Sequence, residues 1–227
     1  MKYAGFLPLS TLDFPHHASC VIFTQGCNMR CPYCHNVGAV KGTQNVSEYS
    51  IYESVRSQRK FLNYAVVSGG EPTIHSDLPD FLSNLKDLGY TIKLDTNGSN
   101  PDLLNVLINE QLVDYVAVDI KTRTFKYDSP EYKLWFGAGR RIVETLRILK
   151  NTDFNYELRV PCVHPLINVH TVAECIQYAY GRPIYLQHVR LDNILSPSYF
   201  ENGYLIPFTE NEIAKLASIR MPNLFIR

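Results

Sequence analysis

Short apolar runs alternate with amphipathic segments along most of this chain of 227 residues. Each run is four to six residues long and rich in Val, Ile, Leu or Tyr, a pattern typical of a buried β-strand. The predicted strands are Cys20–Thr24, Ala65–Ser68, Tyr90–Asp95, Tyr115–Ile120, Asn155–Val160 and Ile184–Val189. The alternation therefore predicts six repeated βα units.

Helices are predicted between these strands from apolar spacing and from terminal signals. In one of them Leu78, Phe81, Leu82 and Leu85 share a face, and Gly89 ends the segment. The predicted helices are Ser47–Tyr64, Asp77–Leu88, Pro101–Gln111 behind an Asn100 cap, Arg140–Lys150, His170–Tyr180 and one from Thr209, where Glu212 gives a capping-box spacing.

Repeated βα units form a parallel sheet, because each crossover helix returns the chain to the same edge in the same direction. The expected class is therefore α/β, with a parallel sheet and outer helices. Six units fit either a partial barrel or an open doubly wound sheet, and periodicity does not separate the two. The terminal run Asn223–Ile226 is expected to add an edge strand.

Length and charge limit the possible functions. With 45% hydrophobic residues, 227 residues are expected to form a single domain, 1–227, with a short N-terminal extension over about 1–17. The 22 basic and 22 acidic residues balance, which predicts neither a nucleic-acid nor a membrane partner. The N-terminus lacks a long apolar segment, so a cytoplasmic location is expected.

Three cysteines lie close together in the segment TQGCNMRCPYCHN, as Cys27, Cys31 and Cys34. Structural zinc sites and ordinary four-iron clusters take four protein ligands, so three thiolates predict a metal position open to a small molecule. Zinc completed by His35 or a distant residue, or three unrelated thiols, are the alternatives. The other three cysteines, Cys20, Cys162 and Cys175, are expected to be buried thiols.

Polar residues follow each predicted strand at its carboxyl end, where parallel α/β folds place their chemistry. They are the cysteine segment after the first strand, Gly69, Gly70 and Glu71 after the second, Asp95 to Gly98 after the third, Asp119 and Lys121 after the fourth, Arg159 at the fifth, and Gln187 and His188 at the sixth. This placement predicts a site along one rim of the sheet.

Each rim residue also has a structural interpretation. Gly69 and Gly70 would allow backbone to approach a ligand, or would only form a turn. Glu71 is expected to cap neighbouring amides at least as much as to contact a ligand. The carboxylate of Asp95 fits a turn, and Asp119 with Lys121 fits a surface ion pair.

The cysteine segment resembles that of the radical S-adenosylmethionine (SAM) enzymes, and GGEP at Gly69–Pro72 supports the resemblance. The resemblance implies a partial (βα)6 barrel and a [4Fe–4S] cluster on Cys27, Cys31 and Cys34, with SAM bound at the fourth iron. It further implies cofactor-binding roles for Tyr33, His35, Gly69, Gly70, Glu71, Asp95, Asp119, Lys121, Arg159 and His188.

The N-terminal residues Gly5 and Ser10–Pro15 narrow the resemblance to the activating enzymes of glycyl-radical enzymes, most closely the activators of anaerobic ribonucleotide reductase. Departures from that pattern are His16 after Pro15 and Val37 after Asn36. No extra cysteine-rich insert is present, which predicts one cluster only.

The resemblance implies one-electron cleavage of SAM to a 5′-deoxyadenosyl radical, which abstracts hydrogen from a glycine of a partner protein. A flavodoxin or ferredoxin is the expected electron donor, since no GxGxxG occurs. One alternative is a radical enzyme with a small-molecule substrate, as in deazapurine synthesis. Another is a non-enzymatic zinc-binding module.

Overall fold

A computed structural model describes residues 1–132, 137–218 and 223–227. The described chain divides into two compact units. The first comprises Met1–Asn28, Asn36–Thr96 and Asn100–Val116, and the second comprises Met29–His35, Asn97–Ser99 and Ala117–Arg227. Each unit carries strands and helices of its own, and the two are described in turn.

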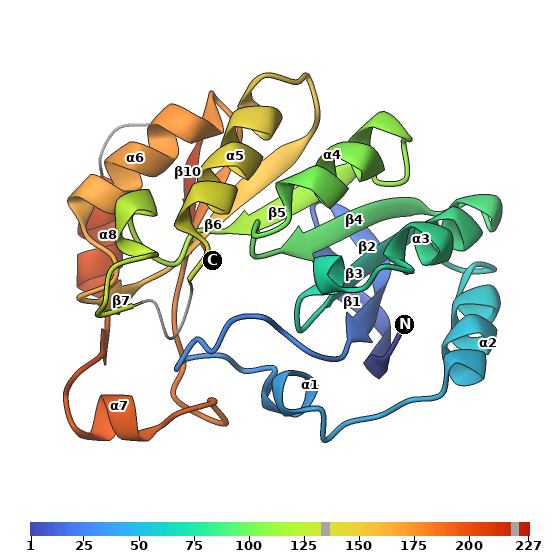
Figure 1. The fold of residues 1–227 in the computed structure, drawn as a ribbon, viewed down its shortest axis with the longest axis horizontal. Coiled ribbons are helices and arrows are strands. Elements are labelled where there is room, and N and C mark those ends of the chain that lie inside the picture. Colours follow the sequence, from blue (N-terminus) through green and yellow to red (C-terminus); the bar gives the residue numbers. More distant parts are fainter. Residues whose placement is uncertain (133–136, 219–222) are drawn as a thin grey trace. The chain divides into compact units, whose positions relative to one another are not determined.

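The strands of the first unit follow the order β1-β2-β3-β4. β1 (Tyr3–Phe14) pairs antiparallel with β2 (His17–Thr24), and β2 pairs parallel with β3 (Tyr64–Gly69). β4 (Thr91–Thr96) is parallel to β3, with Val66 opposite Lys93. The parallel register places the ends of β2, β3 and β4 at one edge (Figure 1).

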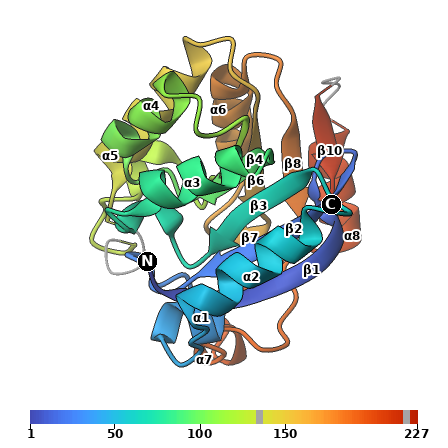
Figure 2. The ribbon, with the colours of Figure 1, turned by 90° about the vertical axis from the view of Figure 1, so that its right-hand side faces the viewer.

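Helices of the first unit begin at clear sequence signals. The helices are α1 (Val37–Lys41), α2 (Glu48–Gln58), the short 3₁₀ helix η1 (Pro72–Ile74), α3 (Leu78–Asp87) and α4 (Pro101–Asn109). Ser47 caps α2 by accepting a hydrogen bond from the amide of Ser50, and Pro101 starts α4. α1 and α2 pack beside β1, as Figure 2 shows in blue and cyan.

The strands of the second unit are mostly parallel. β6 (Tyr156–Pro161) pairs parallel with β8 (Ile184–Gln187), and β8 pairs parallel with β10 (Leu224–Ile226). β7 (Val163–His164) and β9 (Ile206–Pro207) form a separate antiparallel pair. β5 (Tyr115–Asp119) belongs to the first unit through its first two residues and to the second through its last three.

Helices of the second unit are η2 (Thr124–Lys126), α5 (Gly139–Lys150), α6 (Val169–Ala179), α7 (Ser198–Glu201) and α8 (Glu210–Ala217). α5 and α6 pack against each other, and α6 covers β6 and β8 (Figure 1). Thr209 begins α8 with the capping box predicted from Glu212. In the part of the chain that the structure describes, no helix is long and apolar enough to cross a membrane.

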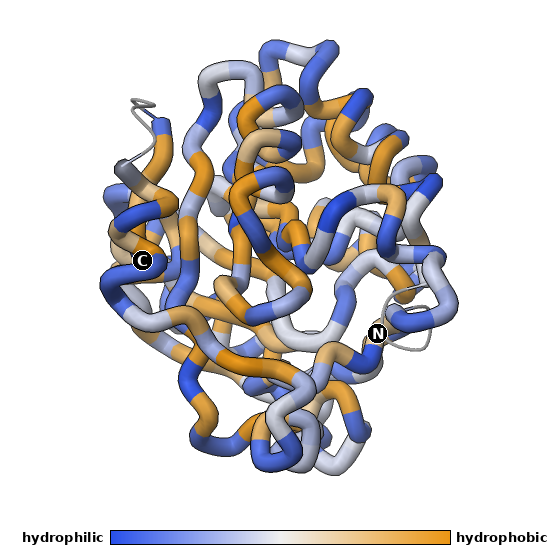
Figure 3. The backbone as a smooth tube through the Cα atoms, turned by 90° about the vertical axis from the view of Figure 1, so that its left-hand side faces the viewer, coloured by the Kyte–Doolittle hydropathy of each residue, from blue (hydrophilic) through white to orange (hydrophobic). Residues whose placement is uncertain are grey.

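Apolar strands supply the core of each unit. All six residues of β6 are buried, as expected for a strand covered on both faces. Along the chain, apolar stretches in orange are broken by short hydrophilic stretches in blue (Figure 3). The predicted buried thiols are confirmed, because Cys20, Cys162 and Cys175 are each at most 2% exposed.

The predicted α/β class with a mostly parallel sheet is confirmed, and so is the terminal strand at Leu224–Ile226. The helix predicted over Ser47–Tyr64 is too long, because it ends at Gln58 and Tyr64 starts β3. β1 lies in the segment expected to be an N-terminal extension. Its apolar residues are interrupted by Gly5, Pro8 and Ser10, so no regular alternation marked it as a strand.

Candidate functional site

The cysteine loop, residues 25–36, connects β2 to α1 and contains neither helix nor strand. Its start is fixed in the first unit, where Gln25 N donates to Lys2 O (2.9 Å) and Gly26 N to Ala39 O (2.8 Å). Cys27 belongs to this unit, whereas Cys31 and Cys34 belong to the second. Cys27 and Cys34 are half-buried and Cys31 is buried. The thiols thus sit on irregular backbone.

Tyr33 of this loop lies in a charged, buried part of the second unit. Its hydroxyl is buried and makes no hydrogen bond within the described residues. Burial raises the pKa of Tyr33 well above its ordinary value, Cys31 adds to the rise, and Lys121 opposes it. A buried hydroxyl of this kind is suited to a ligand's polar atom.

Lys121 and Asp119 form an ion pair after β5. Lys121 Nζ lies 3.1 Å from Asp119 Oδ2, and the lysine side chain is only 9% exposed. Burial alone would lower the pKa of Lys121, but the Asp119 carboxylate, followed by Cys31, raises it well above its ordinary value. Lys121 is therefore a fixed positive charge beside the cysteine loop and Tyr33, rather than half of an exposed surface pair.

Gly69 and Gly70 allow backbone to approach backbone. A Cβ atom on Gly70 would lie 1.8 Å from Gly26 O, and one on Gly69 would lie 2.5 Å from Thr24 N. Gly69 also has a φ of +111°. Gly70 N donates to Thr24 O (2.9 Å) and Glu71 N to Gly26 O (2.8 Å). The two glycines therefore hold the loop after β3 against the start of the cysteine loop.

Two side chains strengthen the contact between the loop after β3, called the glycine loop, and the start of the cysteine loop. Asn36 Nδ2 donates to Gly69 O (2.6 Å), so the residue after His35 reaches back to the glycine loop. His75 Nε2 lies 2.9 Å from Gln25 O, and burial lowers the pKa of His75. A neutral His75 ring that donates to Gln25 O is consistent with that shift.

Glu71 is 1% exposed and serves as a structural acceptor. Its Oε1 accepts hydrogen bonds from Thr73 N (3.1 Å), Thr73 Oγ1 (2.6 Å) and Thr96 Oγ1 (2.7 Å). The carboxylate thus caps η1 and ties it to the end of β4. This arrangement agrees with the structural role expected for Glu71 beside its cofactor-binding role.

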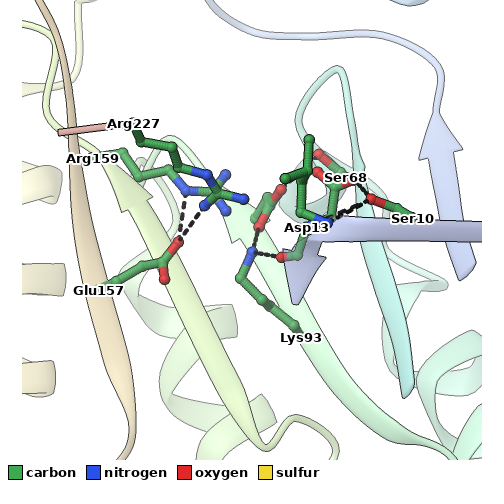
Figure 4. Close-up of polar contacts among 9 residues, drawn as sticks. Ser10, Asp13, Ser68, Lys93, Glu157, Arg159 and Arg227 are labelled. Atoms are coloured by element: carbon green, nitrogen blue, oxygen red, sulfur yellow. Dashed lines mark hydrogen bonds and ion pairs between the residues drawn. The ribbon is translucent and has the colours of Figure 1, made fainter. Parts of the chain in front are cut away.

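Asp95 is part of a polar network of the first unit, of which Figure 4 labels Lys93, Ser68, Asp13 and Ser10. Its Oδ1 lies 2.6 Å from Lys93 Nζ, and its Oδ2 accepts from Ser68 Oγ at 3.0 Å. Lys93 Nζ also donates to Asp13 O (2.7 Å), and Ser10 Oγ bonds the Asp13 carboxylate. Asp95 is thus held in place by groups from β1, β3 and β4, rather than acting only as a turn residue.

Arg159 of β6 is buried in the second unit, at 8% exposure. Its Nε lies 2.7 Å from Glu157 Oε1, an oxygen that is also 3.8 Å from Arg227 Nη1 (Figure 4). Glu157 is fully buried. Arg159 is therefore engaged with a neighbouring carboxylate inside the unit and is not an exposed rim residue.

His35 and His188 are both exposed residues of the second unit. His35 Nδ1 lies 3.2 Å from Asp192 O. His188 follows β8, and its backbone amide donates to Arg227 O at 3.2 Å. The ring of His35 thus touches the segment after β8, whereas the contact of His188 is made by its backbone.

The predicted site residues divide between the units. The first unit holds Cys27, Gly69, Gly70, Glu71 and Asp95; the second holds Cys31, Tyr33, Cys34, His35, Asp119, Lys121, Arg159 and His188. Among the described residues, no three His, Cys, Asp or Glu side chains gather as a site for a single metal ion.

Sequence reasoning missed Lys93 and the side-chain contacts of Asn36 and Thr96. Lys93 lies between the buried apolar residues Ile92 and Leu94 of β4, which was an available signal, because a charged residue in a buried strand needs a partner. The contacts of Asn36 and Thr96 join segments far apart in sequence, and no local pattern predicts them.

The cysteine loop supplies the donor type of an iron–sulfur cluster. The donor set is three thiols on irregular backbone, and thiolates are the usual ligands of iron–sulfur clusters. In the second unit, Cys31 acts on the buried hydroxyl of Tyr33 and on the cation of Lys121, groups that can hold hydroxyl and carboxylate functions of a ligand.

Residues 21–179 match the model of the radical SAM superfamily. The chain belongs to this superfamily. Membership makes it an enzyme of the radical SAM class and implies SAM and an iron–sulfur cluster as cofactors.

Named relatives of this radical SAM protein fall into more than one group. A Methanocaldococcus jannaschii protein named "Putative glycyl-radical enzyme activating enzyme" is 33% identical over 193 residues, which cover 78% of this chain and 77% of the relative. A Pyrococcus horikoshii protein named "Probable GTP 3′,8-cyclase" is 30% identical over 144 residues, which cover 63% of this chain and 45% of the relative. The chain thus spans less than half of the second relative.

Solved radical SAM structures share the fold. A radical SAM methyltransferase from Sphaerobacter thermophilus aligns with a TM-score of 0.66 and 15% identity, over 96% of this chain and 68% of that chain. This likeness extends well beyond residues 21–179 and includes the C-terminal strands and helices.

Proposed function

We propose that this radical SAM enzyme cleaves SAM reductively and activates a glycyl-radical enzyme, anaerobic ribonucleotide reductase. Cys27, Cys31 and Cys34 would hold one [4Fe–4S] cluster through their thiolates. When bound, the cluster and SAM together supply an electron, cleavage of the sulfonium bond and a 5′-deoxyadenosyl radical. A flavodoxin or ferredoxin would supply the electron from outside.

The observation that carries the proposal is a fixed positive charge, that of Lys121, which acts on Cys31 of the cysteine loop. Lys121 is buried and held positive by Asp119, and its charge acts on Tyr33. A compact ammonium group in this position suits a carboxylate such as that of the methionyl end of SAM. The hydroxyl of Tyr33 is available as a second contact.

Residues of the first unit would hold and orient the positively charged ammonium group at the methionyl end of SAM. Asp95 is fixed by Lys93 and Ser68, and its carboxylate is suited to an ammonium group. Glu71, through Thr73 and Thr96, keeps the glycine loop in place beside the start of the cysteine loop. These contacts support a binding site formed before the ligand arrives.

The choice of a protein substrate is supported by the relative named as a glycyl-radical enzyme activating enzyme, which aligns over 78% of this chain. The N-terminal residues Ser10–Pro15 also support a protein substrate, because they resemble those of glycyl-radical activating enzymes. A small-molecule substrate is the second candidate, and it is favoured by the relative named as a GTP cyclase.

The deciding experiment uses the full chain, reconstituted anaerobically with iron and sulfide, reduced, and mixed with SAM and an anaerobic ribonucleotide reductase. We expect 5′-deoxyadenosine and a glycyl-radical doublet in electron paramagnetic resonance. Cys31→Ala should abolish both. Cys162→Ala is the matched control, because Cys162 is a buried thiol outside the loop and should leave both signals.

Two results would count against the proposal. Turnover of SAM that depends on GTP, with no doublet on the reductase, would favour the small-molecule reading. A colourless protein that binds one zinc ion and never yields 5′-deoxyadenosine would refute both readings.

A further inference from the structure

A pocket of about 530 Å³ lies in the second unit, outside the residues assigned to the cofactors. Its size falls within the range of ordinary ligand sites. The described residues that line it come from the segment after η2, the turn after β7 and the region of α7: Glu131, Tyr132, Pro165, Ser198, Tyr199, Asn202, Tyr204 and Leu205. We refer to it as the Tyr204 pocket.

The segment that leads into one wall of the Tyr204 pocket is hydrogen-bonded to the cysteine loop. Leu195 N donates to Cys34 O and Ser196 N donates to Pro32 O, both at 3.0 Å. The chain then runs straight into α7, whose residues Ser198 and Tyr199 line the pocket. The α7 wall therefore begins two residues beyond a contact with the cysteine loop.

The turn that carries Pro165 is bonded to the segment after β5. Thr122, the residue after Lys121, donates from Oγ1 to Leu166 O at 3.0 Å. Tyr127 Oη accepts from the backbone amide of Lys121 at 2.7 Å, in the stretch that leads to Glu131. The other walls of the pocket are thus attached to the neighbourhood of Lys121, so the pocket adjoins the candidate site.

The lining chemistry is aromatic and mostly uncharged. Tyr132 and Leu205 are buried at 2% exposure, whereas Tyr204 is 69% exposed. Tyr199 and Tyr204 meet edge to face with ring centroids 6.3 Å apart. Tyrosines of this kind bind apolar side chains with their rings and peptide groups with their hydroxyls.

Charge and exposed surface indicate what binds. Among the described lining residues, Glu131 carries the only charge, and Lys126 lies behind the lining with its Nζ 5.5 Å from the centroid of the Tyr132 ring. The apolar surface also continues outward, because Ile206 beside Leu205 is 55% exposed. An extended peptide segment with an apolar side chain would cover both the pocket and this margin.

We propose that the Tyr204 pocket receives an extended loop of the partner protein, with an apolar or aromatic side chain seated against Tyr132 and Leu205. A backbone amide or basic group of the same loop meets Glu131. The inference rests on the proposed function, since it identifies the part of the protein substrate that this enzyme binds while a neighbouring glycine reaches the cofactors.

The test compares Tyr204→Ala with Tyr49→Ala in activation of anaerobic ribonucleotide reductase. Tyr49 is a matched control, an exposed tyrosine of α2 in the first unit at 75% exposure. Each activation rate is divided by the rate of 5′-deoxyadenosine formation without reductase, so that a change in cofactor chemistry cancels. Tyr204→Ala should raise the KM for reductase by about tenfold, as loss of an anchoring tyrosine does at interfaces, and Tyr49→Ala should not.

A photocrosslinker keeps the inference testable if Tyr204→Ala fails to fold. Tyr204→p-benzoylphenylalanine should crosslink purified reductase at its glycyl-radical loop. A wild-type KM for Tyr204→Ala, or crosslinks elsewhere on an activated reductase, would overturn this inference while the proposed function stands. If the wild-type enzyme forms no glycyl radical, the proposed function fails and the pocket assignment fails with it. If GTP prevents crosslinking at residue 204, the pocket binds a small molecule and the inference is wrong.

Discussion

The side chain of Lys93 has no exposed surface, although it carries a charge in the middle of β4. Its ammonium is shared between Asp95 Oδ1 and Asp13 O, and Ser68 bonds the other oxygen of Asp95. Desolvation of a buried ion pair costs several kcal/mol, so such a pair contributes little net stability but is costly to break. Lys93 is best understood as a positioning residue for Asp95.

Lys93→Met is therefore expected to lower the free energy of unfolding by about 3 kcal/mol, because it leaves the buried Asp95 carboxylate without its ammonium partner. Urea unfolding of the reduced apoprotein measures this. Lys86→Met is the control: Lys86 pairs with Asp114 in a more exposed setting, and its loss should cost at most about 1 kcal/mol. Equal losses for the two variants would show that Lys93 does not hold Asp95.

At the scale of elements, the junction between the glycine loop and the cysteine loop depends on contacts between backbones. Thr24, Gly26, Gly70 and Glu71 exchange hydrogen bonds of 2.8 and 2.9 Å across it. A side chain at Gly70 has no space, because its Cβ would overlap Gly26 O at 1.8 Å. The position of Cys27, one residue after Gly26, depends on this junction.

Gly70→Ala should force the two loops apart, destabilise the protein by more than about 2 kcal/mol, and lower the iron content after reconstitution. Gly5→Ala is the matched control, since a Cβ there would make an ordinary contact with Phe23 at 3.8 Å. Unfolding curves and iron analysis of both variants check the prediction. Full iron loading of Gly70→Ala would mean that the cysteine loop does not need this junction.

Local patterns predicted the elements better than they predicted their contacts. The strands around Val66, Leu94 and Leu158 were recognisable because each is a short run that contains Val, Ile, Leu or Tyr. The sequence also placed Gly69 and Gly70 beside the site, yet it could not show that Gly69 approaches Thr24 and Gly70 approaches Gly26, more than forty residues earlier. These contacts depend on the parallel register of β2 and β3, which tertiary packing sets.

At the scale of the whole molecule, the boundary between the two units does not always coincide with the end of an element. It passes through β5, between Val116 and Ala117, and it isolates Met29–His35 of the cysteine loop from the residues on either side. A strand cannot remain half formed without losing its ladder of hydrogen bonds. Unfolding of either unit should therefore remove residues that the other needs.

Buried thiols in the two units allow this cooperativity to be tested. Cys20 of the first unit and Cys162 of the second are both fully buried, and burial raises their pKa values to about 11 and about 12. Both should therefore resist iodoacetamide at pH 8 in the native apoprotein, since the thiolate is the reactive form. Cys34, half-buried in the cysteine loop, should react without denaturant and serves as the internal control.

Pulses of iodoacetamide along a urea titration, read peptide by peptide by mass spectrometry, should show Cys20 and Cys162 becoming reactive at the same urea concentration. Coincident transitions from separate probes are the mark of a single cooperative unit, and they would support the single domain expected from the sequence. If Cys162 reacts at a clearly lower urea concentration than Cys20, the second unit unfolds while the first stays folded, and β5 does not couple them.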